Sequence, residues 1–146
     1  MNDVALADNK RTSFLTECPL SANFLRMFDN MKGVLFFVKN CQAQLVWGNL
    51  LLAEHCGFSS VEELCNTESD FDIFSTELAE RYHLDDLEVM NSGQVKDNIV
   101  ELFPNYLGDL TWFVTTKVPL FDSKGKVRGL CGILQSYDNS SNLGRH

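Results

Sequence analysis

The residues of this chain whose types could do chemistry are its histidines, its cysteines and a few ionisable side chains in apolar segments. There are three histidines and five cysteines. The cysteines form no Cys-x-x-Cys pair, so the sequence contains neither a zinc-ribbon motif nor a thioredoxin-type motif. His55 and Cys56 are adjacent, so on a helix their side chains point about 100° apart and cannot act as base and nucleophile on each other. We therefore expect no metal site and no nucleophilic catalysis.

Glu101 and Lys117 are ionisable residues within segments that otherwise have the composition of half-buried strands. A small α+β enzyme of the ketosteroid-isomerase kind would need a carboxyl group of raised pKa inside a cavity, and Glu101 is the evident candidate. Nothing else in the sequence supports such an enzyme. The alternatives of a sensing domain and of a purely structural domain are both favoured over it.

Composition and net charge limit the kinds of molecule that this chain could bind and where it is found. The chain has 146 residues, of which 45% are hydrophobic, as in a single globular domain. It has 12 Lys and Arg against 20 Asp and Glu, so its formal charge is −8, which disfavours direct binding to nucleic acid or to an anionic membrane. The longest apolar run, Val34–Val38, is too short to cross a membrane, and residues 1–14 lack the apolar core of a secretion signal. We expect a reduced, cytoplasmic protein.

An amphipathic helix is predicted within residues 19–32. Ser21 is a suitable N-cap, and the apolar residues recur at helical spacing on one face: Leu20, Phe24, Met27, Phe28 and Met31. This stripe could pack on the chain's own domain or form a dimer contact, and both interpretations stay open. Residues 1–18 are polar and are predicted to be a flexible N-terminus, and residues 137–146 a C-terminal tail.

The elements between these ends are strands in two blocks with helices between them. Strands are predicted at 33–39 and 44–48, helices at 50–56 and 76–91, and long strands at 95–103, 111–121 and 127–136. This order indicates an α+β domain with an antiparallel sheet over residues 33–136. Strict alternation in the third strand would place on one face Val95, Asp97, Ile99, Glu101 and Phe103.

Several segments, in this order and spacing, resemble the PAS family of sensor domains. The most specific is Trp112–Asp122 (WFVTTKVPLFD) with Gly125 and then Gly129–Ile133 (GLCGI), which is similar to the family's ending. Phe36–Asn40 (FFVKN) resembles its first strand, and Ala53–Leu64 its helical segment. The first hairpin departs from the family by having Ala43 where a Gly is usual. The resemblance is greatest to PAS domains that precede the effector domain of AraC-type bacterial transcription regulators.

The resemblance implies a five-stranded antiparallel sheet in the order 2-1-5-4-3, with short helices over one face and a pocket beneath them. Aligned with flavin-binding members, the pocket face would carry Phe37, Glu101, Phe113, Thr115, Lys117, Leu130, Gly132 and Leu134. Glu101 and Lys117 could hold a carboxylate or amide of a small organic ligand. Alternatively they pair with each other and only fill space. Gly132 would let either a flat ligand or a helix approach the sheet.

Known PAS cofactors fit the sequence poorly. Photoactive flavin domains use a reactive cysteine in the motif Asn-Cys-Arg-Phe-Leu-Gln, whereas the sequence around Cys65 lacks the Arg and Gln. Haem-binding members use a histidine on the long helix, where His83 has polar neighbours. We therefore expect neither flavin nor haem.

The other face of the sheet is also apolar and needs a cover, either the first helix or a second subunit. The candidate homodimer residues are Leu20, Phe24, Phe28, Met31 and Trp112. The sequence thus predicts a homodimeric regulatory domain that senses a small molecule, without catalysis. Any DNA-binding effector domain would lie outside these 146 residues. A purely structural dimerisation domain, with its core too full for a ligand, is the alternative.

Overall fold

Residues 3–137 are described by the computed structural model. Five strands form one antiparallel sheet in the order β2-β1-β5-β4-β3, which confirms the predicted topology. The strands are β1 (Val34–Asn40), β2 (Leu45–Gly48), β3 (Lys96–Leu102), β4 (Trp112–Phe121) and β5 (Val127–Ser136). The helices are α1 (Asp3–Glu17), α2 (Ala22–Asp29), α3 (Leu50–His55), α4 (Val61–Cys65), the 3-10 turn η1 (Asp70–Asp72) and α5 (Thr76–Ser92).

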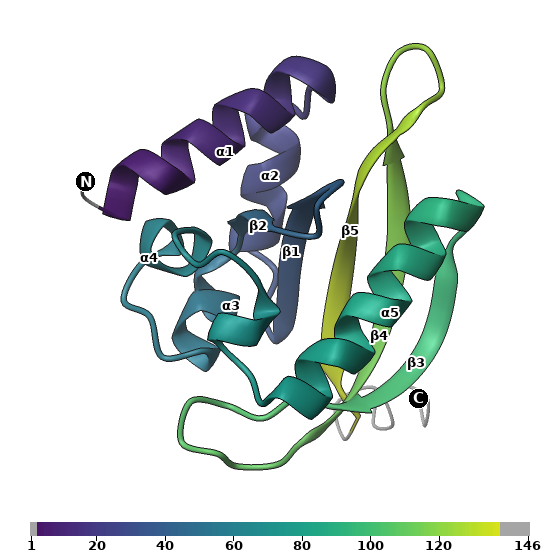
Figure 1. Cartoon of the computed structure of the whole chain (residues 1–146). Helices are drawn as coiled ribbons and strands as arrows, with labels where there is room; N and C mark the ends of the chain where they lie inside the picture. Colours follow the sequence, from purple (N-terminus) through teal and green to yellow (C-terminus); the bar gives the residue numbers. More distant parts are fainter. Residues whose placement is uncertain (1–2, 138–146) are drawn as a thin grey trace.

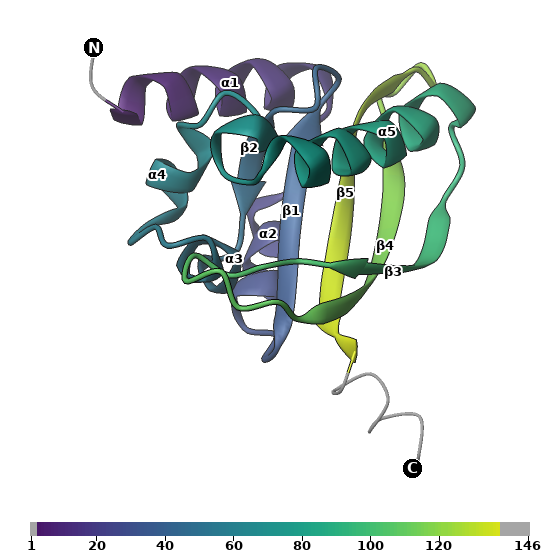
Figure 2. The same cartoon turned by 60° about the horizontal axis from the view of Figure 1, so that its bottom comes forward.

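The sheet has a helical layer on each side (Figure 1). On one side lie α3, α4, η1 and α5, with α5 crossing over β4 and β5 (Figure 2). On the other side α2 packs behind β1 and β2, and α1 lies against β2 and α4. The sheet is therefore the wall shared by two apolar clusters, one on each face.

Local capping sets the helix boundaries. The side chains of Ser21, Asn49, Ser60 and Ser75 each accept a hydrogen bond from a backbone N–H in the first turn of the helix that follows. At its other end α5 stops at Gly93, whose φ of +66° is the left-handed conformation that closes helices. These signals are local in sequence, so the predicted amphipathic helix within residues 19–32 is confirmed as α2.

The prediction of a flexible N-terminus over residues 1–18 is wrong for residues 3–17, which form α1. Ala7, Phe14 and Cys18 are buried, and Phe14 packs with Phe36 and Val38 on the outer face of the sheet. The sequence of α1 did not indicate this contact, because only a few of its side chains face the domain and the others are mostly polar. The predicted tail beyond Tyr137 lies outside the described residues.

The third strand carries a bulge that the alternation pattern did not reveal. Its pairing with β4 shifts by one residue between Lys96 and Ile99, and Asn98 has a φ of +54°. Asp97 therefore lies on the outer face, where its carboxylate accepts a hydrogen bond from Thr116 at 2.7 Å. Glu101 and Phe103 keep their predicted inward direction and are buried, but Val95 and Asp97 do not share their face.

Candidate functional site

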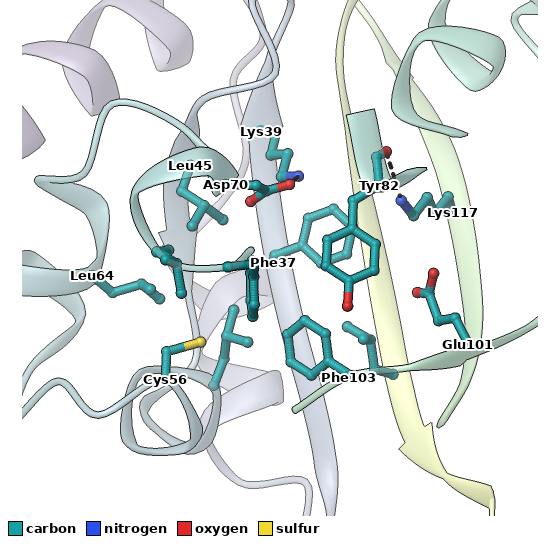
Figure 3. Close-up of a pocket in the computed structure, with 14 residues that line it drawn as sticks. Phe37, Lys39, Leu45, Cys56, Leu64, Asp70, Tyr82, Glu101, Phe103 and Lys117 are labelled. Atoms are coloured by element: carbon teal, nitrogen blue, oxygen red, sulfur yellow. Dashed lines mark hydrogen bonds and ion pairs between the residues drawn. The ribbon is translucent and has the colours of Figure 1, made fainter. Parts of the chain in front are cut away.

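A cavity of about 40 Å³ lies between the sheet and the helices α3, α4, η1 and α5. Figure 3 shows its wall, in which apolar side chains surround a small set of charged ones. The lining residues are Phe37, Lys39, Leu45, Leu52, Cys56, Leu64, Asp70, Ile73, Phe74, Tyr82, Glu101, Phe103, Lys117 and Leu134. A space of this size holds a few water molecules and is smaller than a preformed site for a typical organic ligand.

Four buried charges join the sheet to the helices along one side of the cavity. Lys39 of β1 lies 2.6 Å from Asp70 of η1 and 2.6 Å from Asp86 of α5. Asp86 also lies 2.7 Å from Lys117 of β4, and the Lys117 ammonium donates to the backbone carbonyl of Tyr82 at 3.4 Å. Because every one of these side chains is buried, the pairs offset a large desolvation cost and fix α5 and η1 relative to the sheet.

The pKa values of Lys39 and Asp86 are both shifted by their partners in this network. Burial alone would lower the pKa of Lys39, but Asp70 and Asp86 raise it above the ordinary lysine range. Burial would raise the pKa of Asp86, but Lys39 and Lys117 lower it below that of an ordinary aspartate. Both shifts favour the ionised forms of Lys39 and Asp86 around neutral pH.

Glu101 stands apart from this network. Its Oε1 accepts a hydrogen bond from the Thr115 hydroxyl at 2.8 Å, while its Oε2 is buried with no hydrogen-bond partner. Burial raises the pKa of Glu101, against the opposing effects of Lys117 and of the Thr115 hydroxyl. The expected alternative, a direct Lys117–Glu101 pair, is not what the structure has, because Lys117 pairs with Asp86 on α5.

Aromatic rings enclose the rest of the space. Phe103 lies 5.9 Å from the Tyr82 ring and 5.1 Å from that of Phe74, between centroids. Phe37 lies over Gly132, where a Cβ would overlap its ring, so Gly132 gives space to a side chain of the chain itself. The Tyr82 hydroxyl donates a hydrogen bond of 2.6 Å to the backbone carbonyl of Leu102.

The predicted pocket residues divide into two groups. Phe37, Glu101, Lys117 and Leu134 line the cavity. The other four, Phe113, Thr115, Leu130 and Gly132, lie on the same face of the sheet but are covered by neighbouring side chains and do not line the cavity.

Sequence reasoning missed much of the polar wall. It missed Lys39 and Asp70, which line the cavity, and Asp86, which joins the two lysines. A lysine in an otherwise apolar strand is a signal that could have drawn attention to Lys39.

The residues considered for cofactors lie elsewhere. His83, half-buried on α5, does not line the cavity, and its ring lies 6.4 Å from that of the exposed Phe71. Cys65 is fully buried, and burial raises its pKa to about 11, as expected for an unreactive thiol. Within residues 3–137 there is no cluster of three metal-binding side chains, and no helix in that range is both long and apolar enough to cross a membrane.

The candidate dimer residues are of two kinds. Phe28 stacks on Phe36 with ring centroids 3.7 Å apart, and Leu20 packs against the same cluster, so both belong to the chain's own core. Phe24, Met31 and Trp112 are exposed, as is Met27. Trp112 is on the side of the sheet where α2 lies, on strand β4, which α2 does not cover.

A comparison with protein-family models matches residues 28–138 to the family described as the PAS fold. No curated protein matches the chain. Solved structures with the same fold include Vibrio cholera VqmA in a complex with ligand and DNA, with 22% identity and a TM-score of 0.68 over 80% of this chain.

Two further structures are similar. The Vibrio cholerae VqmA dimer without its target DNA has 21% identity and a TM-score of 0.71 over 86% of this chain. The PAS domain of Bordetella pertussis BvgS has 15% identity and a TM-score of 0.63, with 84% of this chain and 90% of that one covered. The chain spans only 51% and 56% of the two VqmA chains.

Proposed function

Because the chain belongs to the PAS fold family, we propose that it is the sensing domain of a bacterial regulatory protein, in which a small molecule bound in the cavity controls an attached effector. The observation that carries the proposal is the cavity itself, which joins an apolar, aromatic wall to a few fixed polar groups. That combination is typical of sites that bind small ligands. We propose no catalytic step for it.

The ligand must be small, and the cavity must open to admit it. The present volume of about 40 Å³ is far below the few hundred Å³ of a preformed site. Phe74 and Phe103 are the side chains best placed to move. Phe74 is half-buried, and Phe103 begins the exposed connection between β3 and β4. Ligand binding would therefore select a more open arrangement of this side of the domain.

The proposed signal is a change in how α5 and η1 pack on the sheet. Asp70 and Asp86 connect these elements to Lys39 and Lys117, so a ligand that shifts Phe74 or Tyr82 would act on the same elements. Such a ligand changes the population of two packings in proportion to its difference in affinity for them. A DNA-binding effector, if the regulator has one, would lie in another part of the protein, as the VqmA–ligand–DNA complex suggests by analogy.

We further propose that the domain forms a homodimer through the side of the sheet where α2 lies. Met27 and Trp112 are more than half exposed there, and Phe24 and Met31, which flank Met27 in the sequence, are also exposed. A second copy is the occupant that such a face favours, since VqmA, which has the same fold, is described as a dimer.

A structural dimerisation domain without a ligand is the second candidate function. The small cavity favours it, because a core packed this closely is stable without an occupant. The two functions predict the same dimer. They differ in whether any small molecule stabilises the protein.

Native mass spectrometry of protein purified from cells, followed by thermal-shift measurements with a metabolite panel, separates the two functions. We expect a retained or added ligand to raise Tm, and the variant Cys56→Phe, which fills the cavity, to abolish that shift. Leu51→Phe, at an exposed position of α3, is the matched control. A protein that is unliganded and unaffected by the whole panel would establish the structural function instead.

A further inference from the structure

We propose that Glu101 is the anchoring group of the cavity, which selects small, flat, neutral or cationic molecules that carry an N–H donor and rejects carboxylates. This inference rests on the proposed ligand-sensing function and specifies the chemistry of its ligand. Three features of the site support it: an unpaired acceptor, cations that are already paired, and aromatic walls.

The unpaired acceptor is Oε2 of Glu101. The residue is only 3% exposed, its Oε1 is bonded to Thr115, and Oε2 has no hydrogen-bond partner. A buried polar atom without a partner is costly and uncommon, and it indicates a place for a further group. Glu101 lines the cavity, so that group can come from a ligand.

The cations of the site are already paired. Lys39 contacts Asp70 and Asp86, while Lys117 contacts Asp86 and the carbonyl of Tyr82. Two lysines and two aspartates balance each other, which leaves the carboxyl group of Glu101 in excess. A ligand carboxylate would therefore meet no free cation and would face a second acid, whereas an N–H donor would meet the free oxygen.

The ionisable groups around Glu101 come from every element that packs against it. They are Lys117 on β4, Lys39 on β1, Asp70 on η1, Cys56 at the end of α3, and Tyr82, Asp85 and Asp86 on α5. Lys96 on β3 adds a third lysine, and it is paired with Asp85 and Glu88. Apart from these three paired lysines, all of these groups are neutral or acidic. Their combined field favours a neutral or positively charged ligand at the Glu101 end.

The remaining walls favour a flat ligand. Phe37, Tyr82, Phe74 and Phe103 contribute rings to the lining, and Figure 3 shows the Glu101 carboxyl group at the end of the space between Tyr82 and Lys117. An unsaturated ring can stack against these side chains while an exocyclic N–H reaches Oε2.

The test uses three probes of matched shape, benzamidine, benzamide and benzoate, titrated into the whole chain and observed by NMR. We expect benzamidine and benzamide to bind the wild-type cavity at least tenfold more tightly than benzoate. In Glu101→Gln the amide can donate as well as accept, so benzamidine should weaken at least tenfold while benzoate gains. Benzamidine stays protonated, so its affinity should also rise with pH as Glu101 ionises. Glu88→Gln, at an exposed carboxylate of α5, should change none of these affinities.

Different outcomes overturn different claims. If benzoate binds the cavity as well as benzamidine, or if Glu101→Gln leaves the ranking unchanged, the role of Glu101 is refuted while ligand sensing stands. If none of the probes binds, and the metabolite panel also yields no ligand, both claims fail together. A metabolite that binds the cavity through a carboxylate would refute the selectivity alone.

Discussion

Asp86 is the carboxylate that pairs with both buried lysines of the site. It is fully buried and contacts both Lys39 and Lys117, so its loss would break the ion pair of Lys117 and remove one of the two of Lys39. We expect Asp86→Asn to lower the free energy of unfolding by about 3–5 kcal/mol, as for other broken buried pairs. Chemical denaturation would measure the loss.

The neighbouring Asp85 provides the control for Asp86. It pairs with Lys96, and the side chains of Lys96 and Asp85 are 35% and 16% exposed, so this pair is partly solvated, unlike the pairs of Asp86. Asp85→Asn should cost less than about 1 kcal/mol. Equal costs for the two variants would mean that the buried network contributes nothing beyond a surface pair.

Glu101 gives the stability of the domain a distinct dependence on pH. Its pKa is raised in the folded state by burial, so between its unfolded and folded pKa values the native state binds more protons than the unfolded chain. Its effect on stability is therefore absent at acid pH and becomes unfavourable as pH rises. We expect Glu101→Gln to be more stable than wild type at pH 8 by about 1 kcal/mol, with the difference vanishing near pH 4.

Thermal unfolding of the two proteins between pH 4 and pH 8 would test this. Asp86 acts in the opposite direction, because its pKa is lowered in the fold and its stabilising effect is lost as pH falls. That contribution is common to both proteins and cancels in their difference. A difference that is constant with pH would show that folding leaves the pKa of Glu101 unchanged.

At the scale of elements, α1 is part of the domain. Phe14 is buried against the outer face of the sheet, close to Gly129, where a Cβ would meet both Phe14 and the Lys39 carbonyl. We expect Phe14→Ala to cost about 3–5 kcal/mol, measured by urea denaturation. Thr12→Ala, at an exposed position of α1, should change the free energy of unfolding by less than about 0.5 kcal/mol. A small effect of Phe14→Ala on the free energy of unfolding would mean that the packing of α1 on the sheet contributes little to stability.

The bulge in β3 depends on the backbone of Asn98. Its φ of +54° is tolerated by Asn and Gly but is strained for β-branched residues, and the side chain is exposed. We expect Asn98→Val to destabilise the domain by about 1–2 kcal/mol and Asn98→Gly to be neutral or slightly stabilising, in urea denaturation. If Val were tolerated as well as Gly, the bulge would have to lie elsewhere or be absent.

At the scale of the whole molecule, the proposed dimer requires the exposed apolar residues on the side of the sheet where α2 lies. Met27 and Trp112 are 54% and 53% exposed, so Met27→Glu and Trp112→Glu should leave the fold intact while abolishing the dimer in sedimentation velocity. Leu84→Glu is the control, because Leu84 is 66% exposed on α5, on the other side of the sheet. A dimer that survives the first two changes and dissociates in the third would place the interface on α5.

The sequence by itself determined the individual strands and the helix α2, because alternation, capping residues and turn residues act between near neighbours in the chain. The strand order was predicted from the resemblance to PAS domains. Alignment with members of that family also identified four of the residues that line the cavity, Phe37, Glu101, Lys117 and Leu134. Only the tertiary structure decided which charges meet. Asp70 and Asp86 lie 31 and 47 residues from Lys39, and Asp86 lies 31 from Lys117. Pairing over such separations depends on how α5 packs on the sheet, so Lys117 joins Asp86 and leaves Glu101 with a free oxygen.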